Sequence, residues 1–120
     1  MAGKETPNLE HVTIDDEFWS PRVSTTDTTT LEAVYRQLVD AGRFENLRRA
    51  AEGTPGDAQL ALENRMYRDE SDVYKWLEAA SYALSRRSDP DLEARVDYVV
   101  TLLEGAQRDD GYLNSYFSLH

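Results

Sequence analysis

The chain has 120 residues, 40% of them apolar, so it provides at most one small domain. Its formal charge of −10 argues against nucleic acid or an anionic membrane surface as a partner, because basic faces bind both. The chain has no cysteine, which excludes a disulfide, a thiolate zinc site and a cysteine nucleophile within these residues.

The first ten residues, MAGKETPNLE, contain no apolar run, so we do not expect a secretory signal. No segment approaches the roughly 20 apolar residues of a membrane span. We therefore expect a cytoplasmic protein with a flexible start over residues 1–8. The chain has two lysines, against 13 basic and 23 acidic residues in all, and this balance suits a protein of a high-salt environment. An ordinary acidic protein from a GC-rich genome is the other interpretation.

The first predicted element is a short strand or an extended arm over residues 9–15, where apolar and polar residues alternate. Pro21 follows this segment. A proline disfavours helical geometry in the residue before it, so we expect Ser20 to be extended.

The next segment carries the signals of two helices. Thr29 and Glu32 have the spacing of a capping box, which predicts that a helix begins there. Gly42 is a plausible end for it. A second, shorter helix is expected over about residues 46–51.

A turn at 54–57 and a weakly helical segment at 58–66 precede a clearer helix. Ser71 is the expected cap of that helix, and Asp72 sits where the helix dipole favours an anion. Its apolar residues recur at helical spacing and should form one buried stripe: Val73, Trp76, Leu77, Ala80, Ala83 and Leu84.

The last predicted helix begins after SDPD, with Asp89 as its cap and Pro90 as its first residue, and it ends near Gln107. Arg86 and Arg87 fall in the final turn of the preceding helix, where the dipole favours cations. The stripe of the last helix is Leu92, Val96, Val99, Leu103 and Ala106. Two long helices with a short connection predict an antiparallel hairpin and a mainly α fold.

The hairpin carries more aromatic surface than two helices can cover. Tyr74, Trp76, Tyr82 and Tyr98 each bring about 150–250 Å² of surface. Further helices must therefore cover these side chains. The shorter upstream helices are one source, but the amount of aromatic surface favours the rest of a larger helical assembly.

The C-terminal loop is rich in aromatic and amide side chains. Asp110 and Gly111 predict a turn, and Tyr112, Asn114 and Tyr116 follow it. Aromatic rings stack on sugar faces and amides bond sugar hydroxyls, so a carbohydrate site is one interpretation. The other is a loop that folds its rings back onto the helix ends.

Four segments resemble glycoside hydrolase family 127, the β-L-arabinofuranosidase family: VTIDDEFWSPR, GRFENLRRAAEG, SDVYKWLEAASYAL and DGYLNSYF. The last two are specific both in residue identity and in the distance between them. The resemblance covers the chain from about residue 9, and it implies that residues 9–120 are the N-terminal part of a catalytic domain.

The resemblance implies an (α/α)6 barrel, of which this chain would supply the first helical hairpins. It also implies hydrolysis of terminal β-L-arabinofuranosides with retention, by a zinc-bound cysteine thiolate and a glutamate acid/base. In the family these residues lie downstream of the DGYLN block. We therefore expect no catalytic residue and no metal ligand in this chain, and zinc only in a full-length member.

The candidate residues beside the sugar are Asp72, Tyr112, Asn114 and Tyr116, because loops at one end of a helical barrel converge on its pocket. His11 and His120 are isolated, and two lone histidines cannot build a metal site.

The sequence thus predicts an N-terminal fragment of a glycosidase that is inactive by itself. Its expected partners are an arabinose-containing oligosaccharide or glycoside and the missing C-terminal part of the barrel, with neither nucleic acid nor membrane. The alternatives are a non-catalytic helical carbohydrate-binding module and a degenerate remnant.

Overall fold

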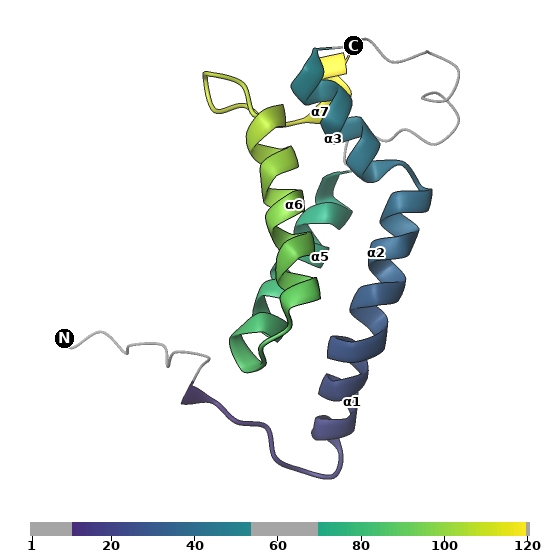
Figure 1. The fold of residues 1–120 in the computed structure, drawn as a ribbon, viewed down its shortest axis with the longest axis vertical. Helices are drawn as coiled ribbons and strands as arrows, with labels where there is room; N and C mark the ends of the chain where they lie inside the picture. The colour runs from purple at the N-terminus through teal and green to yellow at the C-terminus, as the bar shows by residue number, and fades with distance from the viewer. Residues whose placement is uncertain (1–10, 54–69, 120) are drawn as a thin grey trace, which may run out of the picture.

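The computed structural model describes residues 11–53 and 70–119, and the regular elements in these ranges are helical (Figure 1). The predicted mainly α class is confirmed for this part of the chain. The expected flexible start at 1–8, the turn at 54–57 and the weak helix at 58–66 lie outside it. The elements are α1 (Trp19–Thr25), a π-helical turn η2 (Thr26–Thr30), α2 (Leu31–Asp40), α3 (Arg43–Glu52), α5 (Glu70–Arg86), α6 (Pro90–Ala106) and α7 (Ser115–Leu119).

Residues 11–18, the described part of the segment before α1, contain no strand. Residues 12–15 have no regular secondary structure, so the strand alternative for residues 9–15 is wrong over the described part of that segment. Val12 and Ile14 are both 47% exposed, and they line a shallow cavity with Tyr82 near the end of α5. A strand needs a neighbour to pair its backbone groups, and the described residues offer none.

Helix α1 begins earlier than the sequence predicts, and Ser20 is its second residue rather than an extended one. The Asp16 carboxylate accepts hydrogen bonds from the amides of Phe18 and Trp19, and the Ser20 hydroxyl accepts one from the Asp16 amide at 3.0 Å. Pro21 falls in the first turn, where an amide has no intrahelical acceptor to lose. The proline is therefore compatible with the helix that it was expected to interrupt.

The capping box at Thr29 and Glu32 does not form. The helix runs without a break through α1, η2 and α2, as Figure 1 shows. Three threonine hydroxyls of this segment donate hydrogen bonds to backbone carbonyls four residues earlier, at 2.8–3.0 Å. They are those of Thr25, Thr26 and Thr28, and these bonds satisfy the hydroxyls inside the helix. A run of serine and threonine thus extends this helix instead of starting it.

The predicted helix end at Gly42 is confirmed. Gly42 has a φ of 69°, in the left-handed region that favours glycine, and its amide donates to the Val39 carbonyl at 2.9 Å. The shorter helix expected over residues 46–51 is also confirmed, and as α3 it begins about one turn earlier.

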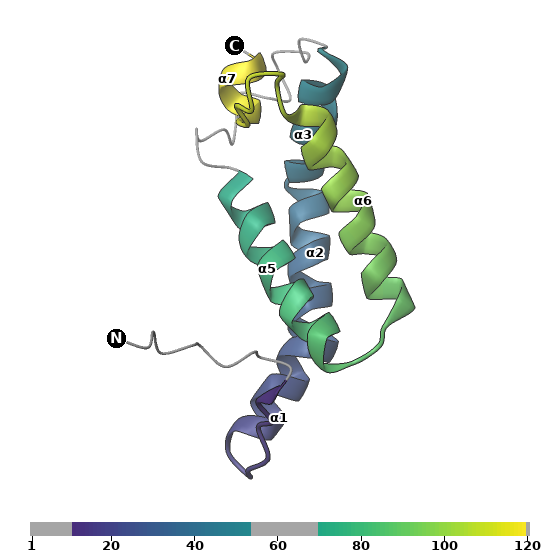
Figure 2. The ribbon, with the colours of Figure 1, turned by 90° about the vertical axis from the view of Figure 1, so that its left-hand side faces the viewer.

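Helices α5 and α6 form the predicted antiparallel hairpin, and α2 lies alongside them (Figures 1 and 2). Asp89 caps α6, accepting the Leu92 amide at 3.1 Å, and Pro90 is the first residue of the helix. Ser71 is not a cap, because Glu70 before it is already helical. The stripe of α5 is confirmed, with four of its residues buried and Leu77 and Leu84 packed against the core.

Helices α3 and α6 approach closely where Gly105 faces Ala51. A Cβ at Gly105 would lie 3.1 Å from the Cβ of Ala51, closer than most side-chain contacts allow. The missing side chain therefore lets the Cβ of Ala51 pack against the backbone of α6 at this point.

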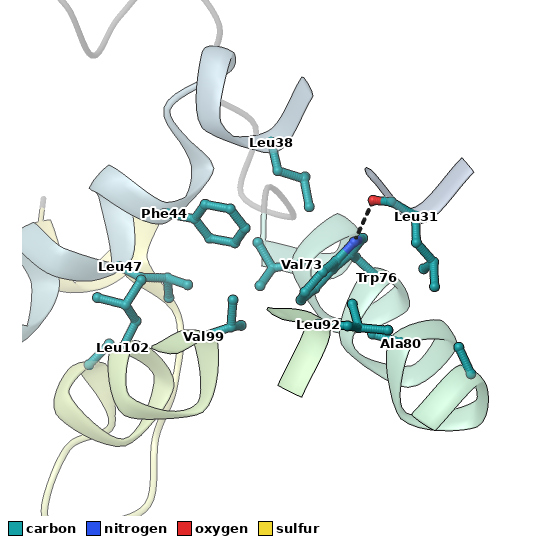
Figure 3. Close-up of a cluster of buried hydrophobic side chains, with 12 residues drawn as sticks. Leu31, Leu38, Phe44, Leu47, Val73, Trp76, Ala80, Leu92, Val99 and Leu102 are labelled. Atoms are coloured by element: carbon teal, nitrogen blue, oxygen red, sulfur yellow. Dashed lines mark hydrogen bonds between the residues drawn. The ribbon is translucent and has the colours of Figure 1, made fainter. Parts of the chain in front are cut away.

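The core lies between α2, α3, α5 and α6, as Figure 3 shows. Trp76 is 2% exposed, its Nε1 donates to the Leu31 carbonyl at 3.0 Å, and its ring lies 5.0 Å from that of Tyr35. Helix α2 thus covers the tryptophan that the hairpin alone would leave exposed. The buried apolar residues are Leu31, Leu38, Phe44, Leu47, Val73, Trp76, Ala80, Ala83, Leu92, Val99, Leu102 and Ala106.

Charged contacts join the start of the long helix to the end of α5. Asp27 is 8% exposed and accepts a hydrogen bond from Nη2 of Arg86 at 2.6 Å. Arg87 donates to the Asp27 carbonyl at 2.7 Å. These arginines, interpreted from the sequence as dipole-stabilising cations, therefore have specific partners on another helix.

Several large apolar side chains stay exposed in the described part of the chain. Tyr74, Tyr82 and Tyr98 are 38–47% exposed, which agrees with the surplus of aromatic surface expected from the sequence. None of the helices in residues 11–53 and 70–119 has the length and apolar character that a bilayer crossing requires.

Candidate functional site

The segment after α6 folds as a tight turn. The Gly111 amide donates to the Arg108 carbonyl at 2.8 Å, and the Arg108 amide donates to the Tyr112 carbonyl at 2.9 Å. Gly111 has a φ of 85°, which favours glycine, so the turn predicted at Asp110 and Gly111 is confirmed. The Gln107 side chain closes the turn by donating to the Gly111 carbonyl at 2.9 Å.

The turn leads into α7, a short helix that the sequence was not expected to form. Oδ1 of Asn114 accepts the Phe117 amide at 3.0 Å, and the Asn114 carbonyl accepts the Ser118 amide at 3.1 Å. Asn114 therefore caps α7. The side-chain carbonyl of Asn114 accepts a backbone amide of α7, and the expected position of Asn114 beside a sugar pocket stays a prediction.

Two of the three aromatic side chains at this end of the chain, in the turn and in α7, remain accessible. Tyr112 is 43% exposed and Phe117 is 54% exposed, whereas Tyr116 is half-buried. The Arg108 guanidinium lies 5.5 Å from the centroid of the Tyr112 ring, and the rings of Tyr116 and Phe117 meet edge to face at 5.1 Å. A loop of fixed rings beside an arginine can stack on a sugar and bond its hydroxyls.

Glu70 joins this loop to α5, and no local sequence pattern marks it as part of a site. Its side chain is buried, with 4% of the residue exposed, and its carboxylate accepts a hydrogen bond from the amide of Ser115 at the start of α7. Burial, with a smaller contribution from the Glu70 charge, raises the pKa of Tyr74 one turn further along the helix. Glu70 was missed because its partner is 45 residues away in sequence.

Asp72 lies at the same end of α5 but on another side of the helix. Residues two apart on a helix do not face each other, so Asp72 points away from the side of Glu70. It is exposed, pairs with Lys75 at 3.3 Å, and borders an apolar groove between α5 and α2 with a volume of about 390 Å³. Trp76, Leu31 and Leu38 are among the other residues that line this groove.

The four predicted site residues therefore gather at one end of the bundle in two places. Tyr112 and Asn114 precede α7 and Tyr116 lies in it, while Asp72 lines the α2–α5 groove, whose walls do not include these three residues.

The described residues do not form a group that fits a metal centre. Within residues 11–53 and 70–119, no three His, Cys, Asp or Glu side chains gather in a way that could hold a metal ion. His11 is exposed, His120 lies outside the described ranges, and the sequence has no cysteine. The thiolate-bound zinc implied by the resemblance needs ligands that these residues do not supply.

Comparison with known proteins gives consistent matches. A model of the β-L-arabinofuranosidase GH127 catalytic domain matches residues 11–120. A non-reducing end β-L-arabinofuranosidase from Bifidobacterium longum subsp. longum is 50% identical over 50 residues, which are 42% of this chain and 8% of that protein.

Two solved structures are similar along most of the chain. One, a GH127 β-L-arabinofuranosidase from Geobacillus stearothermophilus T6, has 34% identity and a TM-score of 0.79 over 89% of this chain. The other, a GH127 β-arabinofuranosidase, has 31% identity and a TM-score of 0.78 over 92% of it. The chain spans 17% of each of these two proteins.

Proposed function

This chain belongs to glycoside hydrolase family 127, and we propose that it supplies the first helical hairpins of an (α/α)6 catalytic barrel that hydrolyses terminal β-L-arabinofuranosides. The observation that carries the proposal is the family match over residues 11–120. The similarity of its helices to those of two solved family members supports the same placement.

In this proposal the chain binds and orients the sugar without performing the chemistry. Tyr112 and Tyr116 border the pocket. Asn114 caps α7, and Asp72 lines the neighbouring groove between α2 and α5. When bound in a full-length protein, zinc would hold the thiolate nucleophile, and its ligands would come from outside this chain. The 120 residues are therefore expected to be inactive alone.

The partner of the chain in this proposal is the C-terminal part of the barrel. The groove beside Asp72 is lined mainly by apolar atoms of α2 and α5, and it is open to solvent in the described chain. Tyr82, Tyr98 and Trp19 are further large apolar side chains without cover, since they are 43%, 47% and 56% exposed. Additional helices of the same barrel would bury them, at about 25 cal/mol for each Å² removed from water.

A hybrid enzyme tests the proposal. Residues 11–119 would replace the matching segment of the Geobacillus stearothermophilus enzyme, and turnover of an aryl β-L-arabinofuranoside would be measured. We expect the hybrid to be active and the isolated chain to be inactive with or without added zinc. A folded hybrid without activity, or zinc-dependent turnover by the isolated chain, would contradict the proposal.

A matched pair of tyrosines tests the sugar-binding loop. Tyr112 and Tyr82 are both 43% exposed, but Tyr82 lies on α5 with its hydroxyl 3.2 Å from Glu78, away from α7. In the hybrid, Tyr112→Ala should raise KM about fivefold, because a stacked ring contributes about 1 kcal/mol. Tyr82→Ala, at a ring that other barrel helices would cover in the hybrid, should lower stability but leave KM within about twofold. Equal effects of the two changes on KM would remove Tyr112 from the site.

The exposed ring of Tyr112 also favours a second candidate, a helical module that binds a carbohydrate without cleaving it. Titration of the isolated chain with methyl β-L-arabinofuranoside, followed by tyrosine fluorescence, distinguishes the two. Saturable binding that Tyr112→Ala abolishes would favour the module, whereas no binding is expected if the pocket needs the rest of the barrel.

A further inference from the structure

Glu70 is a buried acidic residue whose function is not explained by the helix that carries it. It lies at the first described position of α5, is 4% exposed, and reaches across to the amide of Ser115. Ser115 is itself 2% exposed. The contact therefore joins two segments of the chain inside the protein, away from competing water.

The Ser115 amide needs such an acceptor. It is the first amide of α7, and the first amides of a helix have no carbonyl within that helix to bond. Asn114 accepts the amide of Phe117, two residues further on. A buried amide left without an acceptor is costly, and a carboxylate forms a stronger bond with it than a neutral group does.

We propose that Glu70 is a positioning residue that fixes the Tyr112–Tyr116 loop against α5 and thereby sets the shape of the sugar pocket. The inference rests on the proposed function of that loop. Glu70 touches no sugar in this account, and it acts through Ser115 and α7. Because Asp72 lies two residues from Glu70 on the same helix, the contact also fixes the loop relative to Asp72.

Two substitutions at Glu70 separate positioning from a general loss of structure. Glu70→Ala removes the acceptor, whereas Glu70→Gln keeps one side-chain oxygen that can accept the Ser115 amide. Glu78→Ala is the matched control, since Glu78 is an exposed glutamate on the same helix. All three would be made in the hybrid enzyme described above.

The first measurement is hydrogen–deuterium exchange of residues 112–118, with residues 96–103 of α6 as the folding reference. Glu70→Ala should speed exchange of the loop by at least about tenfold while the α6 segment stays protected. Glu70→Gln should restore most of the protection, and Glu78→Ala should change neither segment. Unchanged loop exchange in Glu70→Ala would overturn the inference and leave the proposed function intact.

The second measurement is the division of the kinetic effect between KM and kcat. Because a displaced loop weakens sugar binding without altering the reacting groups, Glu70→Ala should raise KM by on the order of tenfold with kcat changed less than about threefold. Glu70→Gln should recover the KM. Faster loop exchange with an unchanged KM would show that the loop does not border the sugar, and would overturn the inference.

Discussion

The two halves of the long N-terminal helix are held in place by different kinds of contact. The first half, α1 and η2, buries Asp27 and no apolar side chain. The Asp27 carboxylate pairs with Arg86 at the end of α5, and its backbone carbonyl accepts a hydrogen bond from Arg87. The second half, α2, buries Leu31 and Leu38 against the core. The backbone is continuous through both, so helical structure by itself does not reveal which half is packed and which is tethered.

Two large aromatic side chains are exposed at the start of the tethered half. Phe18 and Trp19 are 55% and 56% exposed, and their rings meet edge to face at 4.9 Å. The Arg22 guanidinium lies 3.7 Å from the centroid of the Phe18 ring. A polar tether combined with an uncovered aromatic pair is expected of a segment that borders the remainder of a larger domain.

The largest expected effect distinguishes the two tryptophans. Trp76→Ala should lower the free energy of unfolding by about 3–5 kcal/mol, because it empties a core site and removes the donor to Leu31. In the isolated chain, where Trp19 is 56% exposed, Trp19→Ala should change it by less than about 0.5 kcal/mol. Urea unfolding followed by far-ultraviolet circular dichroism measures both, and similar losses would break the distinction between packed and tethered halves.

The next effect tests the tether itself. Asp27→Ala should lower the free energy of unfolding by about 2–3 kcal/mol, because it leaves the charge of Arg86 without its buried partner. Amide exchange should accelerate first in residues 19–30 and only later in α2. Asp40→Ala, at the exposed end of the same helix, is the control. Equal acceleration along the whole helix would show that the halves do not behave separately.

The smallest effect concerns an exposed ion pair. Hydrogen bonding to Arg48, and then to Arg49, holds the pKa of Glu45 at about 2, below its ordinary 4.5. Because the pKa of Glu45 is lower in the folded state, its ionisation stabilises the fold. This contribution to the free energy of unfolding is complete above pH 4.5 and is lost as the pH falls toward 2. The Glu45 side chain is 39% exposed, so we expect less than about 1 kcal/mol.

Unfolding of the wild type and Glu45→Gln at pH 7 and pH 3 measures this contribution, with Glu104→Gln as the control on α6. The difference in stability between Glu45→Gln and wild type should shrink at the lower pH. A difference that stays constant would assign the effect to packing rather than to charge.

Elements whose signals are local were predictable from the sequence. Gly42 ends α2, Asp89 and Pro90 begin α6, and the apolar stripe around Val73 faces the core. Each signal depends on residues within one or two turns. The long helix over residues 19–30 was not predictable, because it has little apolar periodicity and its one buried side chain pairs with an arginine 59 residues away.

The region proposed as the site could be named from the sequence, but its contacts could not. The sequence indicated the loop of Tyr112 and Asn114 and placed Asp72 at the same end of the bundle. It did not predict α7, whose five residues are too few for a periodic pattern. Glu70 was missed for the same reason as Asp27: its partner adjoins it only in the folded chain, which no local spacing encodes.

The distance along the chain between Asp27 and Arg86 has a consequence for the order of folding events. The α5–α6 hairpin closes over a few residues, whereas the Asp27–Arg86 contact must bring together groups 59 residues apart. Closing the longer loop costs more chain entropy, so the hairpin is expected to form before the rate-limiting barrier and the tether after it. Loss of Asp27 should then speed unfolding and leave the refolding rate nearly unchanged, so the tether determines how long the native state persists.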